Sequence, residues 1–276
     1  MRESLGARPA WYADPWQLAP LRWWDGTAWT EHLLVPSPAP TPPEPSPTFA
    51  LPGGLWGIAG IAVSVVTSFT VLTRLVDHFR WSPAVFIAVF YLPLYGGIAF
   101  TCVAASRRYG TGSLKADFGW RARPTDVWRG MLVWLVAVIT GAIATAPWVH
   151  DQTFRNTGRA IRHGYHQLGP VAVVEFAVVA IVVAPLLEEL AFRGLLQRAL
   201  SERLPVAWAV VIQAVLFGAY HFTPGLGRSN VPGIVGRAAV GAVLGAAAAR
   251  WKRLGPGTVA HMMFNVAFVI SVVAAH

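Results

Sequence analysis

The sequence predicts an all-α polytopic membrane protein of about seven to eight transmembrane helices, preceded by a small Trp-rich β-hairpin module. Three observations support this fold class. The chain of 276 residues is 55% hydrophobic. Only 13% of its residues are charged, whereas ordinary soluble domains contain roughly 25%. The mean hydropathy is +0.49, and the apolar residues gather into long runs after a polar N-terminal segment.

The N-terminal segment, expected to form a module at residues 1–34, contains two aromatic motifs. The first is Trp-Tyr-Ala-Asp-Pro at residues 11–15, and the second is Arg-Trp-Trp-Asp-Gly-Thr-Ala-Trp-Thr at residues 22–30. Asp25-Gly26 is flanked by strand-favouring Trp and Thr residues and therefore predicts a hairpin turn. The segment is unlike a secretory signal peptide, so none is expected. Both motifs resemble the short domain of unknown function 2510 of bacterial membrane proteins, a resemblance that implies no particular activity.

A Pro-rich linker is expected at residues 35–52. Its core, Pro-Ser-Pro-Ala-Pro-Thr-Pro-Pro-Glu-Pro-Ser-Pro-Thr at residues 36–48, favours extended polyproline conformations. The linker would tether the module to a transmembrane domain at residues 53–276. Three options stay open for the aromatic residues of the module: they bind a cytoplasmic partner protein, they bind an interfacial lipid layer, or they only form the module's core.

Seven apolar runs predict seven spans. A helix needs roughly 20 residues to cross about 30 Å of hydrocarbon, and a spanning backbone must satisfy its own hydrogen bonds. The runs are Phe49–Thr73, Trp81–Ser106, Gly130–Val149, Gln167–Leu187, Leu204–Tyr220, Ser229–Ala249 and Leu254–Ala275.

The basic residues indicate topology rather than nucleic acid binding. The net charge is +9 and the pI is near 10.6, yet these residues lie between apolar runs and form no dense block. If the spans alternate, one side carries Arg107, Arg108, Lys115, Arg121, Arg123, Arg129, Arg198, Arg203, Arg250, Lys252 and Arg253. The other side carries Arg74, Arg80, Arg155, Arg159, Arg162 and Arg228. The richer side is expected to be cytoplasmic, which predicts a multi-pass protein of the bacterial cell membrane with a cytoplasmic N-terminus.

Two adjacent glutamates stand at the end of the fourth apolar run, in a chain with only 13 acidic residues. Charged groups at membrane depth are costly and are functional hypotheses by default. Glu189 and Arg193 are four residues apart with the acid N-terminal to the base, which favours an ion pair on a helix. Glu188 points about 100° away round the helix and is left free to accept a proton from water. The alternative is a structural Glu-Arg cluster at a helix end.

Two later runs carry the other candidate residues. His221 ends the stretch Phe-Gly-Ala-Tyr-His, where it is either a catalytic group or a hydrogen-bonded packing residue. His261 and Asn265 are four residues apart, so they share one face of the last span and could donate hydrogen bonds to a developing oxyanion. The alternative for this pair is hydrogen bonding between helices.

The three polar elements together resemble a known family. They are Glu-Glu-x-x-x-Arg at residues 188–193, Phe-x-x-x-His at 217–221 and His-x-x-x-Asn at 261–265. In this order and on successive apolar helices, they resemble the CPBP family (Abi, or type II CAAX prenyl endopeptidase) of intramembrane proteases. The resemblance implies that Glu188 and His221 activate the attacking water, that His261 and Asn265 stabilise the tetrahedral oxyanion, and that Glu189 and Arg193 support the site. It implies a peptide or membrane-protein substrate whose identity cannot be inferred.

That family often has eight spans rather than seven. A short re-entrant or amphipathic segment near Leu190–Leu204 is therefore expected to make up the difference.

The sequence leaves two possibilities for the cofactor of the reaction. A reaction with no required cofactor is preferred, because the pairing of Glu189 with Arg193 leaves one unpaired carboxylate. Zinc is the alternative, bound by Glu188, His221 and His261, since members of the family are often named metalloproteases. The His-Glu-x-x-His motif of ordinary zinc proteases is absent, and the single cysteine, Cys102, lies within a predicted span.

Two other polar residues inside spans are expected to be structural. Glu175 precedes Glu188 by roughly 20 Å along a straight helix, too far to share one water. It is expected to form a structural hydrogen bond, to line a water-filled cavity or to pair with Arg237. Gln213 is expected to form a hydrogen bond between helices.

Two non-enzymatic classes stay open. The chain could be a non-catalytic membrane scaffold or immunity protein that uses the Trp module to recruit a partner. An ion or proton relay in a transporter is the third class, but it predicts inverted repeats, and the hydropathy pattern shows no matching halves.

Overall fold

The computed structural model describes residues 7–35, 51–76 and 82–273. The chain forms two compact units, Met1–Ser46 and Pro47–His276, which are described separately. Most of the predicted linker at residues 35–52 lies outside the described residues, as does the start of the module predicted at residues 1–34. The three domain boundaries therefore stay predictions.

The N-terminal unit is a three-stranded antiparallel sheet in the order β1-β2-β3. Its strands are β1 (Ala10–Ala13), β2 (Leu21–Trp24) and β3 (Trp29–Leu34). The turn predicted at Asp25-Gly26 joins β2 to β3: the Asp25 N–H donates to the Ala28 carbonyl at 3.1 Å, and Gly26 has φ +101°. The prediction of a hairpin lacked β1, which adds a third strand by pairing Ala10 with Trp24.

The buried pair Asp14–Arg22 organises this small sheet. Asp14 accepts a hydrogen bond from Arg22 Nε at 2.8 Å, and only 6% of Asp14 and 7% of Arg22 are exposed. The Asp14 carboxylate also accepts from three backbone N–H groups in the turn between β1 and β2, those of Trp16, Leu18 and Ala19. Indole rings pack edge to face around the sheet, with centroids 5.3–5.4 Å apart for Trp24–Trp29 and Trp11–Trp23. Ion pairing and ring packing thus replace an aliphatic core.

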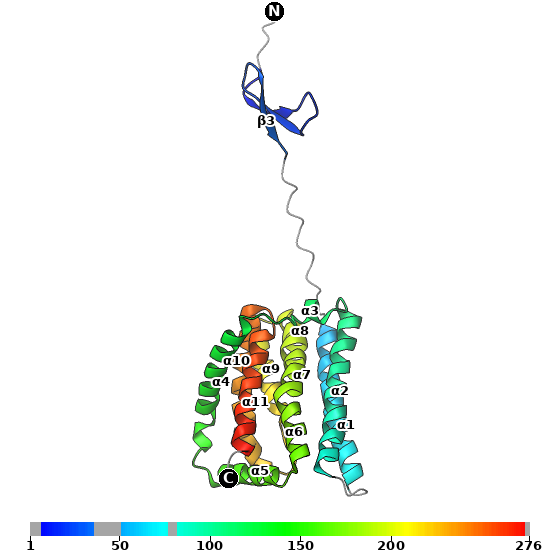
Figure 1. Ribbon diagram of the computed structural model, residues 1–276, viewed down its shortest axis with the longest axis vertical. Helices are drawn as coiled ribbons and strands as arrows, with labels where there is room; N and C mark the ends of the chain where they lie inside the picture. The colour runs from blue at the N-terminus through cyan, green and yellow to red at the C-terminus, as the bar shows by residue number, and fades with distance from the viewer. Residues whose placement is uncertain (1–6, 36–50, 77–81, 274–276) are drawn as a thin grey trace, which may run out of the picture. The chain divides into compact units, whose positions relative to one another are not determined.

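The membrane unit is a helical bundle (Figure 1). Its principal helices are α1 (Leu51–Val76), α2 (Pro83–Tyr109), α3 (Leu114–Asp117), α4 (Asp126–Thr145), α5 (Gln152–His166), α6 (Pro170–Val178), α7 (Ala184–Glu188), α8 (Gln197–Ser201), α9 (Val206–Tyr220), α10 (Asn230–Trp251) and α11 (Gly255–Val273). Two short 3-10 helices are η1 (Ala146–Trp148) and η4 (Gly227–Ser229), and two π-helices are η2 (Val179–Val183) and η3 (Glu189–Leu196).

Within the described ranges, six helical stretches are long and apolar enough to cross a membrane, and α9 is a shorter apolar helix. The six are 52–71, 83–109, 126–148, 170–201, 227–251 and 255–273. With α9 they match the seven apolar runs of the sequence. The chain is therefore a polytopic helical membrane protein with a small β module, as the sequence predicts.

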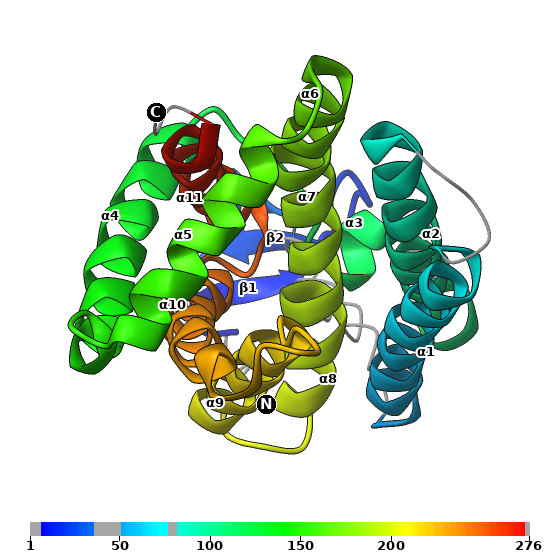
Figure 2. The same ribbon diagram turned by 90° about the horizontal axis from the view of Figure 1, so that it is seen from below.

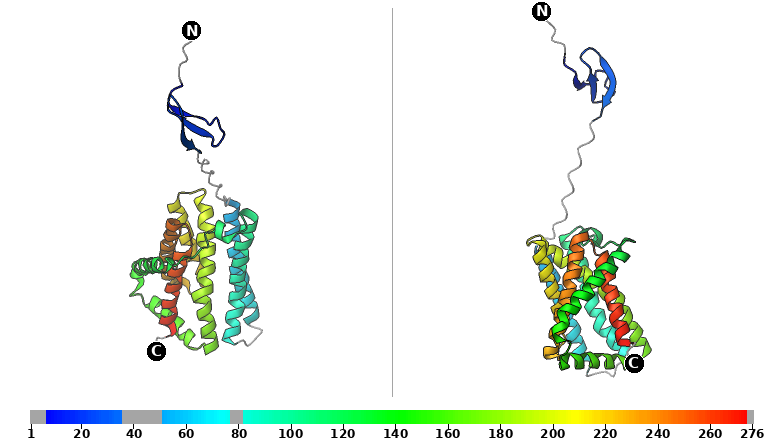
Figure 3. Two further views of the ribbon diagram at one scale, coloured as in Figure 1. Left: turned by 45° about the horizontal axis from the view of Figure 1, so that its top comes forward. Right: turned by 90° about the vertical axis from the view of Figure 1, so that its left-hand side faces the viewer.

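The fourth span, α6 to α8, runs through the middle of the bundle. Figure 2 shows α1 and α2 on one flank of this column and α4, α10 and α11 on the other. Further views show the amphipathic α5 lying across the end of the bundle at which α6 begins (Figure 3). The central column thus contacts helices from both flanks, which is where polar groups from several spans can meet.

One predicted segment is wrong. The re-entrant or amphipathic segment expected near Leu190–Leu204 does not exist, because the fourth span continues through η3 and α8 to Ser201. Its backbone groups remain hydrogen-bonded within the helix through π-helical turns, so the chain has no need to turn back. The amphipathic element is instead α5, whose Arg155, Arg159 and Arg162 are exposed and whose Phe154 and Tyr165 are partly buried.

The N-terminal sheet should lose stability in acid. The Arg22 guanidinium beside Asp14 lowers the pKa of that carboxyl from 3.8 to about 2. Because the folded pKa lies below the unfolded one, the ionised carboxylate stabilises the sheet above about pH 4, and this contribution is lost as the pH falls toward 2. In NMR spectra of the full chain in detergent, the indole N–H of Trp24, which donates to the Ala7 carbonyl at 3.0 Å, reports the folded sheet. We expect this signal to move to its unfolded position between these pH values.

Asp14→Asn is the control for this titration. It removes the ionisable group, so the unfolded indole signal should appear already at neutral pH and change little in acid. An Asn variant that titrates like the wild type would contradict the role given to Asp14.

Candidate active site

Pro185 interrupts the backbone hydrogen bonds of the π-helical turn that precedes Glu188. In η2 the Ala184 N–H donates to the Val179 carbonyl, five residues back. In the same pattern, the N–H of residue 185 would donate to the Ala180 carbonyl. Residue 185 is proline, however, and has no N–H. Asn265 supplies the missing donor from α11, with Nδ2 2.7 Å from the Ala180 oxygen. The last span is therefore fixed against the π-helical turn directly below Glu188.

The two glutamates at 188 and 189 are buried in the bundle, with 3% and 0% of their surfaces exposed. Tyr95 on α2 donates its hydroxyl to Glu188 Oε1 at 2.9 Å. His261 on α11 lies between the two carboxylates: its Nδ1 is 3.1 Å from Glu189 Oε1, and its Nε2 is 3.7 Å from Glu188 Oε2. One imidazole thus contacts both acids, and within the described part of the chain Glu188 Oε2 has no direct hydrogen bond.

Arg193 holds the second carboxylate. Its Nη1 donates to Glu189 Oε1 at 3.0 Å, and its Nη2 donates to the Gly241 carbonyl of α10 at 3.2 Å. The guanidinium also lies over the ring of Phe217 on α9, 4.3 Å from the centroid. The predicted pairing of Glu189 with Arg193 is therefore present, and it joins the fourth span to α9 and α10.

His221 follows the last turn of α9. Its Nδ1 lies 2.8 Å from the Phe217 carbonyl, and because a carbonyl oxygen can only accept, Nδ1 carries the proton. Nε2 of the neutral ring is then left as an acceptor. The Phe217 ring packs against both histidines, with centroid distances of 4.9 Å to His221 and 5.7 Å to His261. Phe217 thus sets the spacing between the two imidazoles.

The structure brings the six predicted residues together to different degrees. Glu188, Glu189, Arg193 and His261 form one network of direct contacts. His221 reaches that network through the Phe217 ring. Asn265 is not part of this network: its side-chain amide donates one hydrogen to the Ala180 carbonyl.

The charges of this network balance only with one extra proton. If Glu188 and Glu189 are both ionised, Arg193 offsets one of the two negative charges. Burying the second charge without a partner would be costly. One proton held within the network would remove the imbalance.

Two polar residues in or near the site, Tyr95 and Gln197, were missed by sequence reasoning. Tyr95 lies on α2, 93 residues before Glu188, and only its i,i+4 spacing from Tyr91 could have drawn attention to it. Gln197 donates to the Gly245 carbonyl at 2.9 Å, alongside the expected interhelical bond from Gln213 to the Gly241 carbonyl at 2.9 Å. A Cβ at Gly245 would lie 2.3 Å from Gln213 Nε2, so glycine is what allows this close approach.

Glu175 and Arg237 do not pair with each other in the described part of the chain. Arg237 Nη1 donates to the Gly233 carbonyl of its own helix at 3.3 Å. Glu175 instead lines a largely apolar groove between α2 and α6, and its Oε2 has no hydrogen-bond partner. Glu175 thus lines a groove with largely apolar walls rather than the water-filled cavity expected from the sequence.

No group of three or more His, Cys, Asp or Glu side chains with metal-binding geometry occurs among residues 7–35, 51–76 and 82–273. The three residues of the zinc alternative each keep one free donor atom. Those atoms are Glu188 Oε2, His221 Nε2 and His261 Nε2.

Fold and site together define a polytopic helical membrane protein with an acid, arginine and histidine cluster built across its spans. Residues 170–267, from α6 into α11, match the family described as type II CAAX prenyl endopeptidase Rce1-like. Residues 9–45 match the protein of unknown function family DUF2510. Both resemblances predicted from the motifs are confirmed, and the first supports a CAAX-type intramembrane protease at family level. No curated protein and no solved structure matches the chain.

Asn265→Ala should destabilise the membrane unit. The substitution leaves the Ala180 carbonyl without a donor, because Pro185 cannot replace the amide, and a buried polar group left unsatisfied costs about 1–3 kcal/mol. Denaturant titration of the purified protein in detergent measures the loss. Ser271→Ala on the same helix is the control, since its exposed hydroxyl donates only to its own helix at Phe268. Equal free energies of unfolding for the two variants would show that the Asn265 contact does not stabilise the membrane unit.

Proposed function

We propose that the chain is an intramembrane endopeptidase of the glutamate and histidine type, in which Glu188 activates the water that attacks the peptide bond. The observation that carries the proposal is the asymmetric setting of the Glu188 carboxylate. One oxygen is held by Tyr95 at 2.9 Å, and the other faces His261 Nε2 at 3.7 Å. The carboxylate is thus oriented by one neighbour and kept available by the other.

In this reaction Glu188 takes a proton from water as the water oxygen bonds to the peptide carbonyl carbon. His221 assists as a second acceptor, a role consistent with its neutral Nε2. The tetrahedral intermediate then breaks its carbon–nitrogen bond, and the proton on Glu188 passes to the leaving amine nitrogen. Every atom and proton of the reaction is supplied by water, substrate and these side chains.

His261 and Asn265 are the proposed donors to the oxyanion. Glu189 orients His261 by accepting from Nδ1, so a proton on Nε2 would point toward Glu188 Oε2 and the water held there. Asn265 uses one amide hydrogen for the Ala180 carbonyl and has a second one to offer. Glu189 and Arg193 act through these contacts as supporting residues.

We infer that the substrate is a peptide or membrane protein reached from within the bilayer, and that the N-terminus is cytoplasmic in a bacterial cell. The excess of basic residues on the side of Arg107, Arg198 and Arg250 supports this orientation. Protection of the N-terminal unit from protease in inside-out vesicles would contradict it.

The sharpest test of the proposed base compares two glutamates of the same span. Glu188→Gln should lower the rate of cleavage of a quenched peptide library by at least about 100-fold, since a general base contributes roughly 10²–10⁴. Glu175→Gln removes an intramembrane carboxylate outside the contact network and should change the rate by less than about threefold. His221→Ala is expected to follow Glu188→Gln. Equal rates for the two glutamine variants would remove Glu188 from the mechanism.

The cofactor is tested separately. We propose that cleavage requires no metal, so the rate should stay within about twofold of its starting value after prolonged treatment with a strong chelator. Complete loss that is restored by added zinc would assign Glu188, His221 and His261 as metal ligands instead. In that case zinc would polarise the substrate carbonyl and lower the pKa of a bound water.

A further inference from the structure

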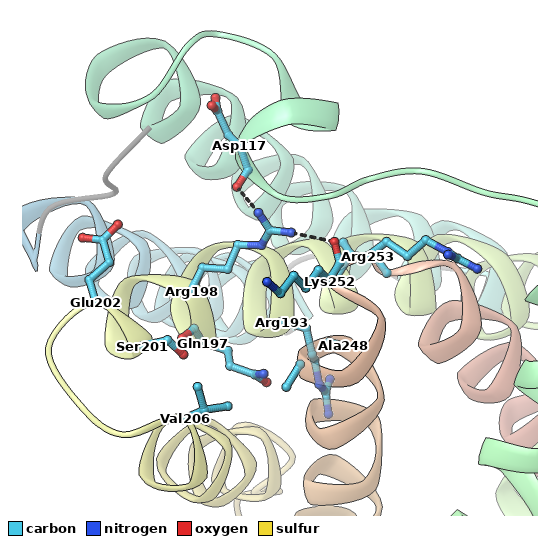
Figure 4. Close-up of a pocket in the computed structure, with 12 residues that line it drawn as sticks. Asp117, Arg193, Gln197, Arg198, Ser201, Glu202, Val206, Ala248, Lys252 and Arg253 are labelled. Atoms are coloured by element: carbon cyan, nitrogen blue, oxygen red, sulfur yellow. Dashed lines mark hydrogen bonds between the residues drawn. The ribbon is translucent and has the colours of Figure 1, made fainter. Parts of the chain in front are cut away.

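A cavity of about 310 Å³ lies at one end of the bundle, and its wall includes Arg193, a supporting residue of the candidate active site. It is enclosed by α8, the start of α9, the end of α10 and the turn into α11. Figure 4 shows Arg198 and Lys252 at its rim and Gln197 extending between Val206 and Ala248. Neither the family match nor the proposed peptidase reaction uses this cavity.

Two positive charges in the cavity are not neutralised by contact with a carboxylate. Arg198 donates its hydrogen bonds to backbone oxygens: Nη1 lies 2.9 Å from the Asp117 carbonyl and Nη2 lies 3.2 Å from the Lys252 carbonyl. The exposed Lys252 side chain makes no hydrogen bond or ion pair within the part of the chain that the structure describes.

The remaining charged residues of the wall are satisfied by protein contacts. Arg193 pairs with Glu189 and Arg253 pairs with Asp126. The Asp117 carboxylate accepts hydrogen bonds from Ser106 and Thr111, and Glu202 also has an interaction within the chain. Arg198 and Lys252 are therefore the cations of the wall that an anion can reach without displacing an ion pair of the described residues.

The backbone at Lys252 adds an independent observation. Lys252 ends α10 in the left-handed conformation, with φ 51° and ψ 32°. Glycine is the residue that most often ends a helix in this way, because a Cβ makes the conformation less favourable. The chain keeps a lysine here, and its ammonium lies at the mouth of the cavity.

The level of the cavity relative to the ends of the spans indicates which kind of anion it can bind. The fourth span ends at Ser201, the span of α10 ends at Trp251 and the last span begins at Gly255, so the cavity lies at the membrane surface. Exposed tryptophans mark the same end of the bundle, at Trp120, Trp128 and Trp208. Indoles of this kind favour the headgroup level of a bilayer, where lipid phosphates lie.

The inner wall provides a complementary acceptor. Gln197 is 4% exposed, and its Nε2 is committed to the Gly245 carbonyl, which fixes the orientation of the amide. Its Oε1 is buried and has no hydrogen-bond donor among the residues that the structure describes. A headgroup that carries a hydroxyl beside its phosphate would supply that donor after a small movement of the side chain.

We propose that this cavity binds the phosphate-bearing headgroup of an anionic phospholipid, with phosphate oxygens on Lys252 and Arg198 and a headgroup hydroxyl directed toward Gln197. The same chemistry occurs in soluble phosphate esters, and the position at the span ends favours the lipid. The proposal does not rest on peptidase activity, and lipid binding is measured without a peptide substrate, so the two can fail separately.

The test is native mass spectrometry of the full chain, released from detergent micelles that contain equal amounts of phosphatidylglycerol and phosphatidylcholine. The wild type should retain phosphatidylglycerol in preference to phosphatidylcholine. Lys252→Gly suits the left-handed backbone and should fold at least as well as the wild type. It should reduce retention of phosphatidylglycerol on the order of tenfold, because one charge-assisted hydrogen bond to phosphate is lost.

Arg203→Ala is the matched control. It removes one exposed positive charge from the same end of the bundle without touching the cavity. It should change retention by less than about twofold, since an exposed charge is well screened. Loss of lipid in both variants would indicate only general attraction to the surface and would overturn the proposal.

A second arm separates the two sources of phosphate. sn-Glycerol 3-phosphate, added to protein stripped of lipid, should not raise the thermal stability of the wild type at millimolar concentration. Stabilisation that disappears in Lys252→Gly would assign the cavity to a soluble phosphate ester. Equal retention of both lipids by the wild type would exclude a headgroup site altogether.

Discussion

The buried ion pair of Glu189 and Arg193 is the interaction on which the rest of the membrane unit depends. Both residues are at most 1% exposed, so each charge has lost its water and needs the other. Removing one partner of such a pair typically costs about 3–5 kcal/mol, because the remaining charge is left uncompensated. The same two side chains reach the Gly241 carbonyl, the Phe217 ring and the His261 imidazole. One pair thus fixes the relative positions of the fourth span, α9, α10 and α11.

This arrangement also explains how a second buried carboxylate is held at membrane depth. Glu189 contacts both Arg193 and His261 through its Oε1, whereas Glu188 has one oxygen bound to Tyr95 and one that faces an imidazole. In the proposed reaction the two adjacent acids therefore have opposite tasks, one as a structural anchor and one as a base. The ion pair with Arg193 leaves one negative charge in the low-dielectric interior, and one proton held within the network would remove it.

Local patterns in the sequence predicted much of this. The spans follow from hydropathy, and the pairing of Glu189 with Arg193 follows from their spacing on one helix. Contacts that depend on three-dimensional register could not be predicted in the same way. Tyr95 belongs to a distant helix, and the bond from Asn265 to Ala180 exists only because a π-helical turn meets Pro185. The continuation of the fourth span to Ser201 likewise depends on η3, which hydropathy does not distinguish from a turn.

The central claim is that Glu189 holds His261 through Nδ1, and ¹⁵N NMR of the imidazole tests it most directly. In labelled protein in detergent, Nδ1 of His261 should be protonated and hydrogen-bonded both in the wild type and in Glu188→Gln, since the contact with Glu189 is 3.1 Å and does not involve Glu188. Glu189→Gln should weaken that hydrogen bond. A wild-type His261 with an unprotonated Nδ1 and a protonated Nε2 would contradict the account, because Glu189 would then have no proton to accept.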